Sequence, residues 1–264
     1  MSTPADAQDH LAQAATRGAL PPGWRVTYVP STSSTQDLAR AAAQAGAPTG
    51  SVFVADYQTA GRGRQGRRWI APPGSALLLS ILFREEARAP APQRYTMLVS
   101  VALAEAIEEL APEVSPAIKW PNDLMLGGRK LAGVLAETAW DGEQLAVIVG
   151  VGTNVRLGGA DLASVAPLAT SLVLEAGRWV DRGELFLAFM RRIDAWLPRS
   201  LPDLHAAWHA RLWGRGQRLR LRGGAAGPEQ EQEVVVLGAD LDGSLRVRLA
   251  SGAELRTASG ELIL

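Results

Sequence analysis

Cysteine does not occur anywhere in the 264-residue sequence, so disulfide bonds, thiolate nucleophiles and cysteine-ligated metal sites are excluded. An excess of charge is also lacking, because 27 basic and 27 acidic residues give a formal net charge of +0, which argues against a protein that coats nucleic acid. The longest strongly apolar run, residues 76–83, is far too short to span a bilayer. The first residues include Asp6 and Asp9 and lack the apolar stretch of a secretory signal. These absences favour a cytoplasmic enzyme or binding protein that makes no membrane contact.

Lysine and histidine are scarce. Among the 27 basic residues only Lys119 and Lys130 are lysines. An ammonium is a compact point charge and a guanidinium a broad planar fork, so two lysines close together indicate a specific role, with chance as the alternative. His205 and His209 have the spacing of a zinc-protease helix, but Ala206 stands where that motif needs glutamate. We therefore expect both histidines to be surface or partly packed helix residues.

Apolar periodicity predicts an α+β chain built on a mixed sheet. Strands are expected over residues 24–29, 51–58 and 76–83, and a further set over 124–155 with turns at Gly127-Gly128 and Asp141-Gly142. Helices are expected over residues 33–46, 96–110, 167–176 and 183–197. Two pairs have the spacing of capping boxes, namely Ser34 with Asp37 and Asp181 with Glu184.

The sequence pattern changes after about Gly214, where short runs of alternating apolar and polar residues are separated by glycine-rich turns such as Asp242-Gly243. This pattern predicts a small β-barrel or sandwich. We expect three parts: a frayed or loosely helical leader (1–22), a main domain (23–213) and a C-terminal β domain (214–264). The leader is too short for a winged-helix DNA-binding module, so a repressor function is not expected.

The segment GRGRQGRRW (61–69) concentrates four arginines and three glycines. It matches G-x-G-x-x-G, but Pro72-Pro73-Gly74 prevents the helix that a dinucleotide fingerprint must open. The kinase form of the motif needs valine where Arg68 stands. Gly-Arg segments that bind RNA are usually long and repetitive, whereas this one is short and lies between two strands. Fixed cations on a flexible backbone indicate a loop that closes on an anion, with a solvated surface loop as the alternative.

A second cluster is KWPNDLMLGGRKLAGVLAE (119–137). Pro121 breaks the chain and presents Asn122 and Asp123 at a turn or strand edge, and an ordinary turn is the alternative reading. Gly133, three residues after Lys130, permits close approach to the backbone. A third stretch, GVGTNV (150–155), ends a strand with small residues and Asn154, as a ligand-facing strand end would.

In this order and spacing, TAGRGRQGRRW, KWPNDL, RKLAGVLAE and GVGTNV resemble the biotin protein ligases. The resemblance runs from about residue 27 to the C-terminus. It implies a mixed-sheet catalytic domain of the class II synthetase and biotin ligase type, followed by a small SH3-like β-barrel. It also implies that biotin and ATP form biotinyl-5′-AMP with release of pyrophosphate, and that biotin then passes to a lysine of a biotin carboxyl carrier protein. The DNA-binding domain of repressor-type members is not seen, so no DNA partner is implied.

Residue roles follow from the resemblance alone. The catalytic residues it implies are Lys130, Asp123 and Arg64. The biotin-binding residues it implies are Ser34, Thr35, Gln36, Gln58, Arg62, Gly63, Arg64 and Lys130. The residues it implies for ATP and the adenylate are Arg62, Arg64, Arg67, Trp69, Lys119, Asn122, Asp123 and Asn154. Mg²⁺ is expected with the nucleotide, with Asp123 as an indirect ligand, and no metal site of the protein's own is expected. Gln65 departs from the family pattern, in which some relatives carry another basic residue.

Two other functions stay open at this point. A lipoate or octanoyl protein ligase or transferase shares this fold, although its different glycine-rich signature is not seen here. A non-catalytic biotin-binding sensor would bind without turnover, although the presence of both Lys130 and Asp123 favours catalysis. The family includes monomers and homodimers, so the oligomeric state stays open as well. We expect the arginine loop to be mobile when empty and ordered around a ligand.

Overall fold

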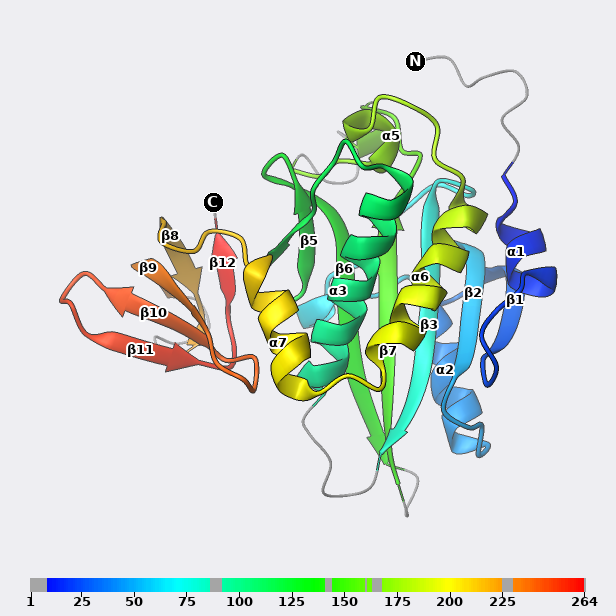
Figure 1. Cartoon of the computed structure of the whole chain (residues 1–264), viewed down its shortest axis with the longest axis horizontal. Helices are drawn as coiled ribbons and strands as arrows, with labels where there is room; N and C mark the ends of the chain where they lie inside the picture. The colour runs from blue at the N-terminus through cyan, green and yellow to red at the C-terminus, as the bar shows by residue number, and fades with distance from the viewer. Residues whose placement is uncertain are drawn as a thin grey trace.

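The computed structural model describes residues 9–85, 92–140, 144–159, 161–162, 168–224 and 230–263. Within these residues the chain forms a large mixed sheet covered by helices and a smaller antiparallel sheet beside it (Figure 1). The α+β architecture predicted from the sequence is therefore confirmed. No helix in this part of the chain has the length and hydropathy that crossing a bilayer requires.

The large sheet contains seven strands in the order β1-β2-β3-β7-β6-β5-β4. Only β1 and β2 run parallel, and every other neighbouring pair is antiparallel. The bounds are β1 Arg25–Thr32, β2 Ser51–Gln58, β3 Ala76–Glu85, β4 Ala117–Lys119, β5 Asp123–Leu126, β6 Arg129–Trp140 and β7 Leu145–Asn154. The predicted turn at Gly127-Gly128 joins β5 to β6, and both glycines have positive φ, which glycine tolerates best. The predicted turn at Asp141-Gly142 lies outside the described residues.

Helices cover both faces of this sheet. The helices are α1 Leu11–Arg17, α2 Thr35–Gln44, α3 Gln93–Leu110, α5 Leu172–Glu175, α6 Arg182–Trp196 and α7 Leu201–Ala210. The α3 and α6 helices pack side by side and bury their apolar residues with Leu77, Leu79 and Ile81 of β3 in the main core. On the opposite face, α2 packs Ala39 and Ala43 against Leu82 of β3 and Ile148 of β7. The rest of that face is left for the residues between β2 and β3.

Strand register decides which side chains share this second face. Lys119 stands opposite Asp123, Asp123 opposite Gly133, Gly133 opposite Gly152, and Gly152 opposite Leu78. Directly opposed residues point to the same side of a sheet. The face therefore carries a row with two charged residues at one end, two glycines in the middle and a leucine at the other end.

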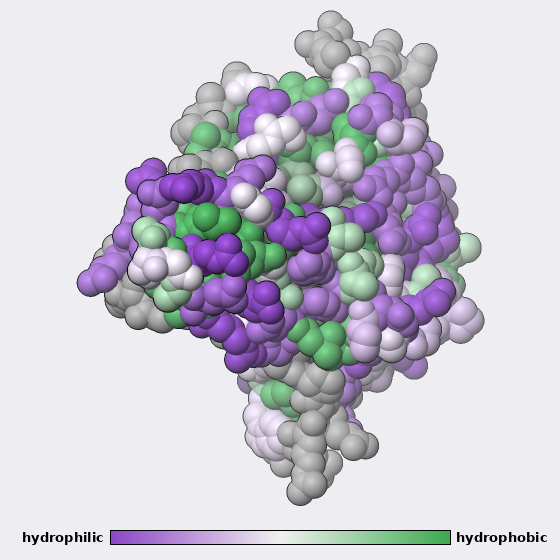
Figure 2. Space-filling view, turned by 60° about the vertical axis from the view of Figure 1, so that its left-hand side comes forward, coloured by the Kyte–Doolittle hydropathy of each residue, from purple (hydrophilic) through white to green (hydrophobic). Residues whose placement is uncertain are grey.

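The small sheet follows the main domain and has the strand order β11-β10-β9-β8-β12. Its strands are β8 Arg218–Arg222, β9 Glu231–Ala239, β10 Leu245–Leu249, β11 Glu254–Thr257 and β12 Glu261–Ile263. Within the described residues β11 and β12 form its two edges, and this arrangement does not contradict the small β-barrel expected from the sequence. The small sheet carries arginine–carboxylate pairs such as Arg222 with Glu231. The left of Figure 2 shows mainly hydrophilic surface around a smaller hydrophobic patch.

The large sheet and the residues beside it contact the turn between β9 and β10 of the small sheet and the end of α7, where Arg211 is the C-cap. The Trp120 indole donates to the Gly243 carbonyl at 2.9 Å, and the Ile118 amide donates to the Arg211 carbonyl at 2.7 Å. The small sheet thereby lies beside β4 and β5, and α7 leads into it (Figure 1). Because the small sheet lies here, its strand β12 stands at the edge of the functional site described below.

Several helical predictions need correction. The helix predicted over residues 167–176 is only Leu172–Glu175, because the backbone of Ala169 pairs with Lys130 as a β-bridge. Part of that predicted range lies outside the described residues. The leader is more ordered than expected at residues 11–17, where α1 buries Leu11 and packs on α6.

The two predicted helix caps have different outcomes. Asp181 caps α6 by accepting from the Glu184 amide at 2.9 Å. Ser34 also caps its helix, but its hydroxyl accepts from the Gln36 amide at 3.3 Å rather than from the amide of Asp37. The Asp37 carboxylate is instead directed to the arginine-rich loop.

Candidate functional site

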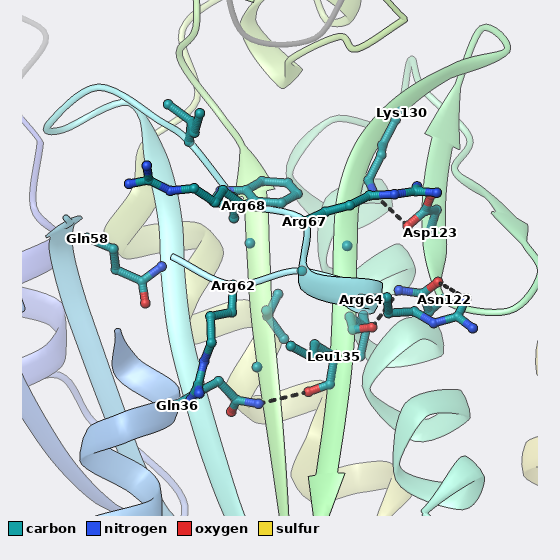
Figure 3. A pocket seen from close by; sticks show the side chains of 18 of the residues that line it. Gln36, Gln58, Arg62, Arg64, Arg67, Arg68, Asn122, Asp123, Lys130 and Leu135 are labelled. Atoms are coloured by element: carbon teal, nitrogen blue, oxygen red, sulfur yellow. Dashed lines mark hydrogen bonds and ion pairs between the residues drawn. The ribbon is translucent and has the colours of Figure 1, made fainter. Parts of the chain in front are cut away.

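A cavity of about 250 Å³ lies on the second face of the large sheet, between α2 and the arginine loop (Figure 3). Every residue to which the sequence assigned a binding or catalytic role lines it, apart from Lys119. The lining residues from that prediction are Ser34, Thr35, Gln36, Gln58, Arg62, Gly63, Arg64, Arg67, Trp69, Asn122, Asp123, Lys130 and Asn154. Residues that are up to 120 positions apart in the sequence are therefore brought into one cavity.

Three glycines make the floor of the cavity. A Cβ on Gly152 would lie 2.5 Å from the Trp69 ring, and one on Gly133 would lie 3.3 Å from it. A Cβ on Gly150 would lie 3.0 Å from the side-chain amide of Gln36. Because β6 and β7 carry no side chains here, the indole and the amide rest directly on the backbone. The sequence signalled this at Gly133 but gave no reason to single out Gly150 and Gly152 individually.

One end of the cavity is lined mainly by uncharged polar side chains, and Arg62, which lies beside them, is ion-paired. Gln58 Oε1 accepts from the Thr35 amide at 2.7 Å and the Thr35 hydroxyl at 3.0 Å, and Thr35 Oγ1 lies 2.8 Å from Ser80 Oγ. Gln36 Nε2 donates to the Leu135 carbonyl at 3.3 Å, which ties α2 to β6. Gln36 Oε1 is buried and has no hydrogen-bond partner among the described residues. This end therefore offers an acceptor to an N–H group of a ligand.

The opposite end is charged. Lys130 Nζ lies 2.7 Å from Asp123 Oδ1 and 5.8 Å from the Trp69 ring centroid. Lys119 Nζ lies behind this pair, 4.0 Å from Asp123 Oδ2 and 3.6 Å from Glu261 Oε1. Two ammonium groups thus share one buried carboxylate, and Lys119 acts on the cavity through Asp123 and Glu261 rather than by lining it.

A bulge aims Lys130 into the site. The register of β5 and β6 pairs Leu124 with Ala132 but Met125 with Lys130, which leaves Leu131 as an extra residue. If the strand alternated regularly through Leu131 without the bulge, Lys130 would point to the opposite face, because side chains alternate along a strand. Asp123 and Lys130 therefore meet because of a local register shift that sequence periodicity does not reveal.

The two asparagines are fixed by the backbone beside them. Asn122 Nδ2 donates to the Val134 carbonyl at 2.8 Å, and Asn154 Nδ2 donates to the Thr170 carbonyl at 3.0 Å. Asn122 follows the cis peptide bond between Trp120 and Pro121. Both residues line the cavity, and the amide oxygen of Asn122 accepts from Arg64 Nη1 at 3.3 Å.

The arginine loop, residues 61–69, folds over the cavity as a small hairpin, and we call it the lid. Its backbone is closed by Gly63 N–H to the Arg67 carbonyl at 2.8 Å and Trp69 N–H to the Gly61 carbonyl at 3.0 Å. Gln65 sits at the tip with φ of +56°, a left-handed conformation in a residue other than glycine. The lid places Trp69 against the floor and spreads four arginines around the rim.

Burial and charge perturb the groups where the lid meets the small sheet. Burial lowers the pKa of Arg64, whose guanidinium donates to the Gly260 carbonyl at 3.4 Å. A hydrogen bond from Arg67 Nη2 to Glu261 Oε2, 2.7 Å long, raises the pKa of Arg67. Burial raises the pKa of Glu261, but this bond and the charges of Lys119 and Arg67 outweigh it and lower that pKa overall. The lid is thus electrostatically bound to β12.

Glu261 lines the cavity, and sequence reasoning missed it. It belongs to the small sheet yet lines the cavity and contacts both Arg67 and Lys119. Its segment carries only a short strand pattern, so no local signal could have identified it. Among the described residues no group of three or more histidines and carboxylates could hold a metal ion. Asp123 already faces two ammonium groups, so the described residues do not fit a metal held by the protein alone.

The chain is similar in sequence and fold to known proteins. The family model described as the biotin/lipoate A/B protein ligase family matches residues 28–154. The chain is 33% identical over 206 residues to the bifunctional ligase/repressor BirA of Bacillus subtilis, which covers 76% of this chain and 63% of that protein. It is 33% identical over 252 residues to the biotin–[acetyl-CoA-carboxylase] ligase of Mycobacterium tuberculosis, and the aligned region spans 91% of this chain and 90% of the mycobacterial protein.

A solved structure agrees with these matches. The biotin protein ligase from Aquifex aeolicus in complex with biotin and ATP has a TM-score of 0.73 and 25% identity, covering 90% of this chain and 97% of that chain. The present chain spans less than two thirds of the length of the Bacillus relative but nearly all of the mycobacterial and Aquifex proteins. Together with the cavity and its motifs, these matches show that the chain belongs to the biotin protein ligase family.

Proposed function

We propose that this protein joins biotin to ATP to form biotinyl-5′-AMP and then transfers biotin to a lysine of a biotin carboxyl carrier protein. The observation that carries this proposal is the division of one cavity into a neutral polar end and a cationic end. Biotin has the same division, with an uncharged bicyclic ring and a carboxylate joined by an aliphatic chain. The mycobacterial relative is named for the acetyl-CoA carboxylase as acceptor, which supports a carrier of that class.

The ring of biotin belongs at the neutral end in this proposal. Its ureido group has two N–H donors and one carbonyl acceptor. Gln36 Oε1 is a buried acceptor with no partner among the described residues, so an N–H of the ring would satisfy it. Ser34, Thr35 and Gln58 supply the remaining polar groups around the ring.

The first step brings two anions together. The biotin carboxylate attacks the α-phosphorus of ATP, the new bond is a carboxyl–phosphate anhydride, and the bond to pyrophosphate breaks. Repulsion between two unit charges about 4 Å apart is roughly 4 kcal/mol at an effective dielectric near 20. Lys130 and Arg64, which both line the cavity near Asn122 and Asp123, offset this repulsion and stabilise charge on the phosphate.

The adenine side of the nucleotide belongs beside Trp69 and Asn154, and the phosphates beside Arg64 and Arg67. Mg²⁺ enters with the phosphates in this proposal and neutralises their charge, because the described residues provide no metal cage. The closed lid keeps water from the anhydride until the carrier arrives. The reaction uses a cytoplasmic nucleotide, and we propose that the protein acts in that compartment.

The second step needs a neutral amine. The target lysine loses a proton, attacks the carboxyl carbon and expels AMP, so that an amide forms. We propose that Asp123 accepts or orients that proton, because its carboxylate lies at the reacting end of the cavity.

Biotin-dependent exchange of pyrophosphate into ATP tests the first step. Incubation with apo-carrier, biotin and ATP followed by mass spectrometry of the carrier tests the second. We expect exchange with biotin and a carrier heavier by one biotinyl group. Exchange that depends on octanoate or lipoate instead of biotin would show that the protein is an octanoyl or lipoate ligase. Binding of biotin without any exchange would show that it is a non-catalytic biotin sensor.

A further inference from the structure

The four arginines of the lid have different partners. Arg62 Nη2 lies 2.7 Å from Asp37 Oδ1 and 3.7 Å from Glu137 Oε2. Arg64 donates instead to two uncharged oxygens, those of the Asn122 side chain and the Gly260 carbonyl. The charge of Arg62 is therefore balanced by two carboxylates of the protein, whereas Arg64 has no carboxylate within ion-pair distance in the described part of the chain.

The two carboxylates that face Arg62 stand at the neutral end of the cavity. Asp37 follows Gln36 on α2, and Glu137 lies two residues beyond Leu135 on β6. Arg40 of α2 also contacts Glu137, with Nη2 at 2.7 Å from Oε2. Figure 3 shows Arg62 descending from the lid toward Gln36, while Arg64 lies on the other side of the cavity beside Asn122.

This placement separates the tasks of the two arginines. A cation can stabilise a developing phosphate charge only where that charge develops, which in the proposed reaction is the end of the cavity that holds Lys130 and Asp123. Arg62 lies instead at the end where the proposed ligand carries no charge, and it pairs there with Asp37 and Glu137. An ion-paired guanidinium suits that end, because it closes the cavity without presenting an unbalanced charge to an uncharged ring.

We infer that Asp37 and Glu137 are positioning residues that hold Arg62 as a strap over the uncharged end of the ligand, and that Arg62 does not bind phosphate. The identity of that ligand rests on the proposed function. The strap itself does not, because all of its contacts are made within the protein. The sequence resemblance implied that Arg62 binds both biotin and the adenylate. Here Arg62 keeps its role at biotin and has none at the adenylate.

Hydrogen exchange of residues 61–69 in the ligand-free protein tests the strap independently of any ligand. We expect Asp37→Asn and Glu137→Gln each to speed exchange in the lid by about 1.5-fold to fivefold, as loss of a partly exposed ion pair allows. Glu113→Gln removes an exposed pair with Arg178 outside the cavity and is the matched control, with no change expected in the lid. Unchanged lid exchange in both test variants would overturn the strap, even if the protein binds no biotin.

Ligand kinetics test the division of tasks. Asp37→Asn and Arg62→Met should speed biotin dissociation by a similar factor, leave the ATP KM of pyrophosphate exchange unchanged, and give no further loss when combined. Asp37→Glu should restore slow dissociation, because it keeps the charge. A raised ATP KM in Arg62→Met with normal biotin dissociation would make Arg62 a phosphate ligand and overturn the inference. If the wild-type protein binds no biotin, the proposed function is wrong. Hydrogen exchange of the lid still tests whether Asp37 and Glu137 hold Arg62.

Discussion

Gly152→Ala is a sensitive test of how the floor of the cavity positions the lid. The added Cβ would lie 2.5, 2.7 and 2.9 Å from three atoms of the Trp69 ring. Ordinary carbon contacts are about 3.5–4.0 Å, so the ring would have to move by about 1 Å. The backbone of Gly152 cannot move instead, because β7 is hydrogen-bonded to β3 on one side and β6 on the other. The displacement therefore falls on Trp69 and on the lid that carries it.

The size of the effect follows from that displacement. Forcing an extra methyl group into a packed site costs about 1–3 kcal/mol of stability, and the low end applies here because the lid can yield. A misplacement of about 1 Å in a site that orients two reactants slows reaction by about 10²-fold. We expect Gly152→Ala to lower the rate of biotinyl-AMP formation by about that factor and to affect biotin binding less. Gln36 and the neutral end rest on Gly150, not on Gly152.

The assay compares pyrophosphate exchange with biotin binding measured by calorimetry. Gly159→Ala is the control, because a Cβ at that glycine meets nothing within 4 Å. Adding Trp69→Leu to Gly152→Ala should remove the clash and restore the thermal stability but not the nucleotide affinity. Wild-type exchange rates and unchanged tryptophan fluorescence in Gly152→Ala would show that the indole does not rest on this glycine.

Three other substitutions probe the charged end, the link between the sheets and a helix cap. Asp123→Asn should slow transfer to the carrier more than adenylation, and equal effects on both steps would remove Asp123 as base or orienting group. The lowered pKa of Glu261 means that its carboxylate stabilises the fold fully above its ordinary pKa of 4.5, and that this contribution disappears as the pH falls through the folded-state value. Urea unfolding should therefore find Glu261→Gln less stable than wild type by about 1 kcal/mol at pH 7, with the difference vanishing in acid, and a constant difference would contradict this. Asp181→Ala removes the cap of α6 and should reduce the free energy of unfolding by about 0.5–2 kcal/mol, whereas no loss in urea unfolding would show that the cap is dispensable.

Local patterns predicted the strands of the large sheet well because each strand signal is contained in its own residues. The run at 51–58 is β2 with the same bounds, and the run at 76–83 lies within β3. The helix predicted at 167–176 was wrong because its apolar residues serve a bridge to Lys130 and only one helical turn. Strand β4 was not predicted, since three residues cannot show an alternation.

The site, like the fold, could be predicted only where the signal lies in contiguous residues. Motif residues such as Asp123 and Lys130 could be named from the sequence, because each motif is contiguous. Their contact could not be derived, since it depends on the bulge that turns Lys130 toward Asp123. Glu261 and Glu137 reach the lid only through tertiary packing, so even the motif that ends at Glu137 does not reveal its contact with Arg62.

The same packing explains why lysine survives at two positions in a chain that otherwise uses arginine. Lys130 Nζ is 3.4 Å from where a Cβ on Gly133 would stand, while it contacts Asp123 and faces the Trp69 ring. A compact ammonium concentrates its charge at one atom that Asp123 can hold, whereas a planar guanidinium spreads its charge over a fork. Lys119 is more enclosed than Lys130, since its side chain is only 12% exposed between two carboxylates. Arginine occupies the rim, where partners are spread apart and a fork can reach them, so the choice of cation follows the arrangement of its partners.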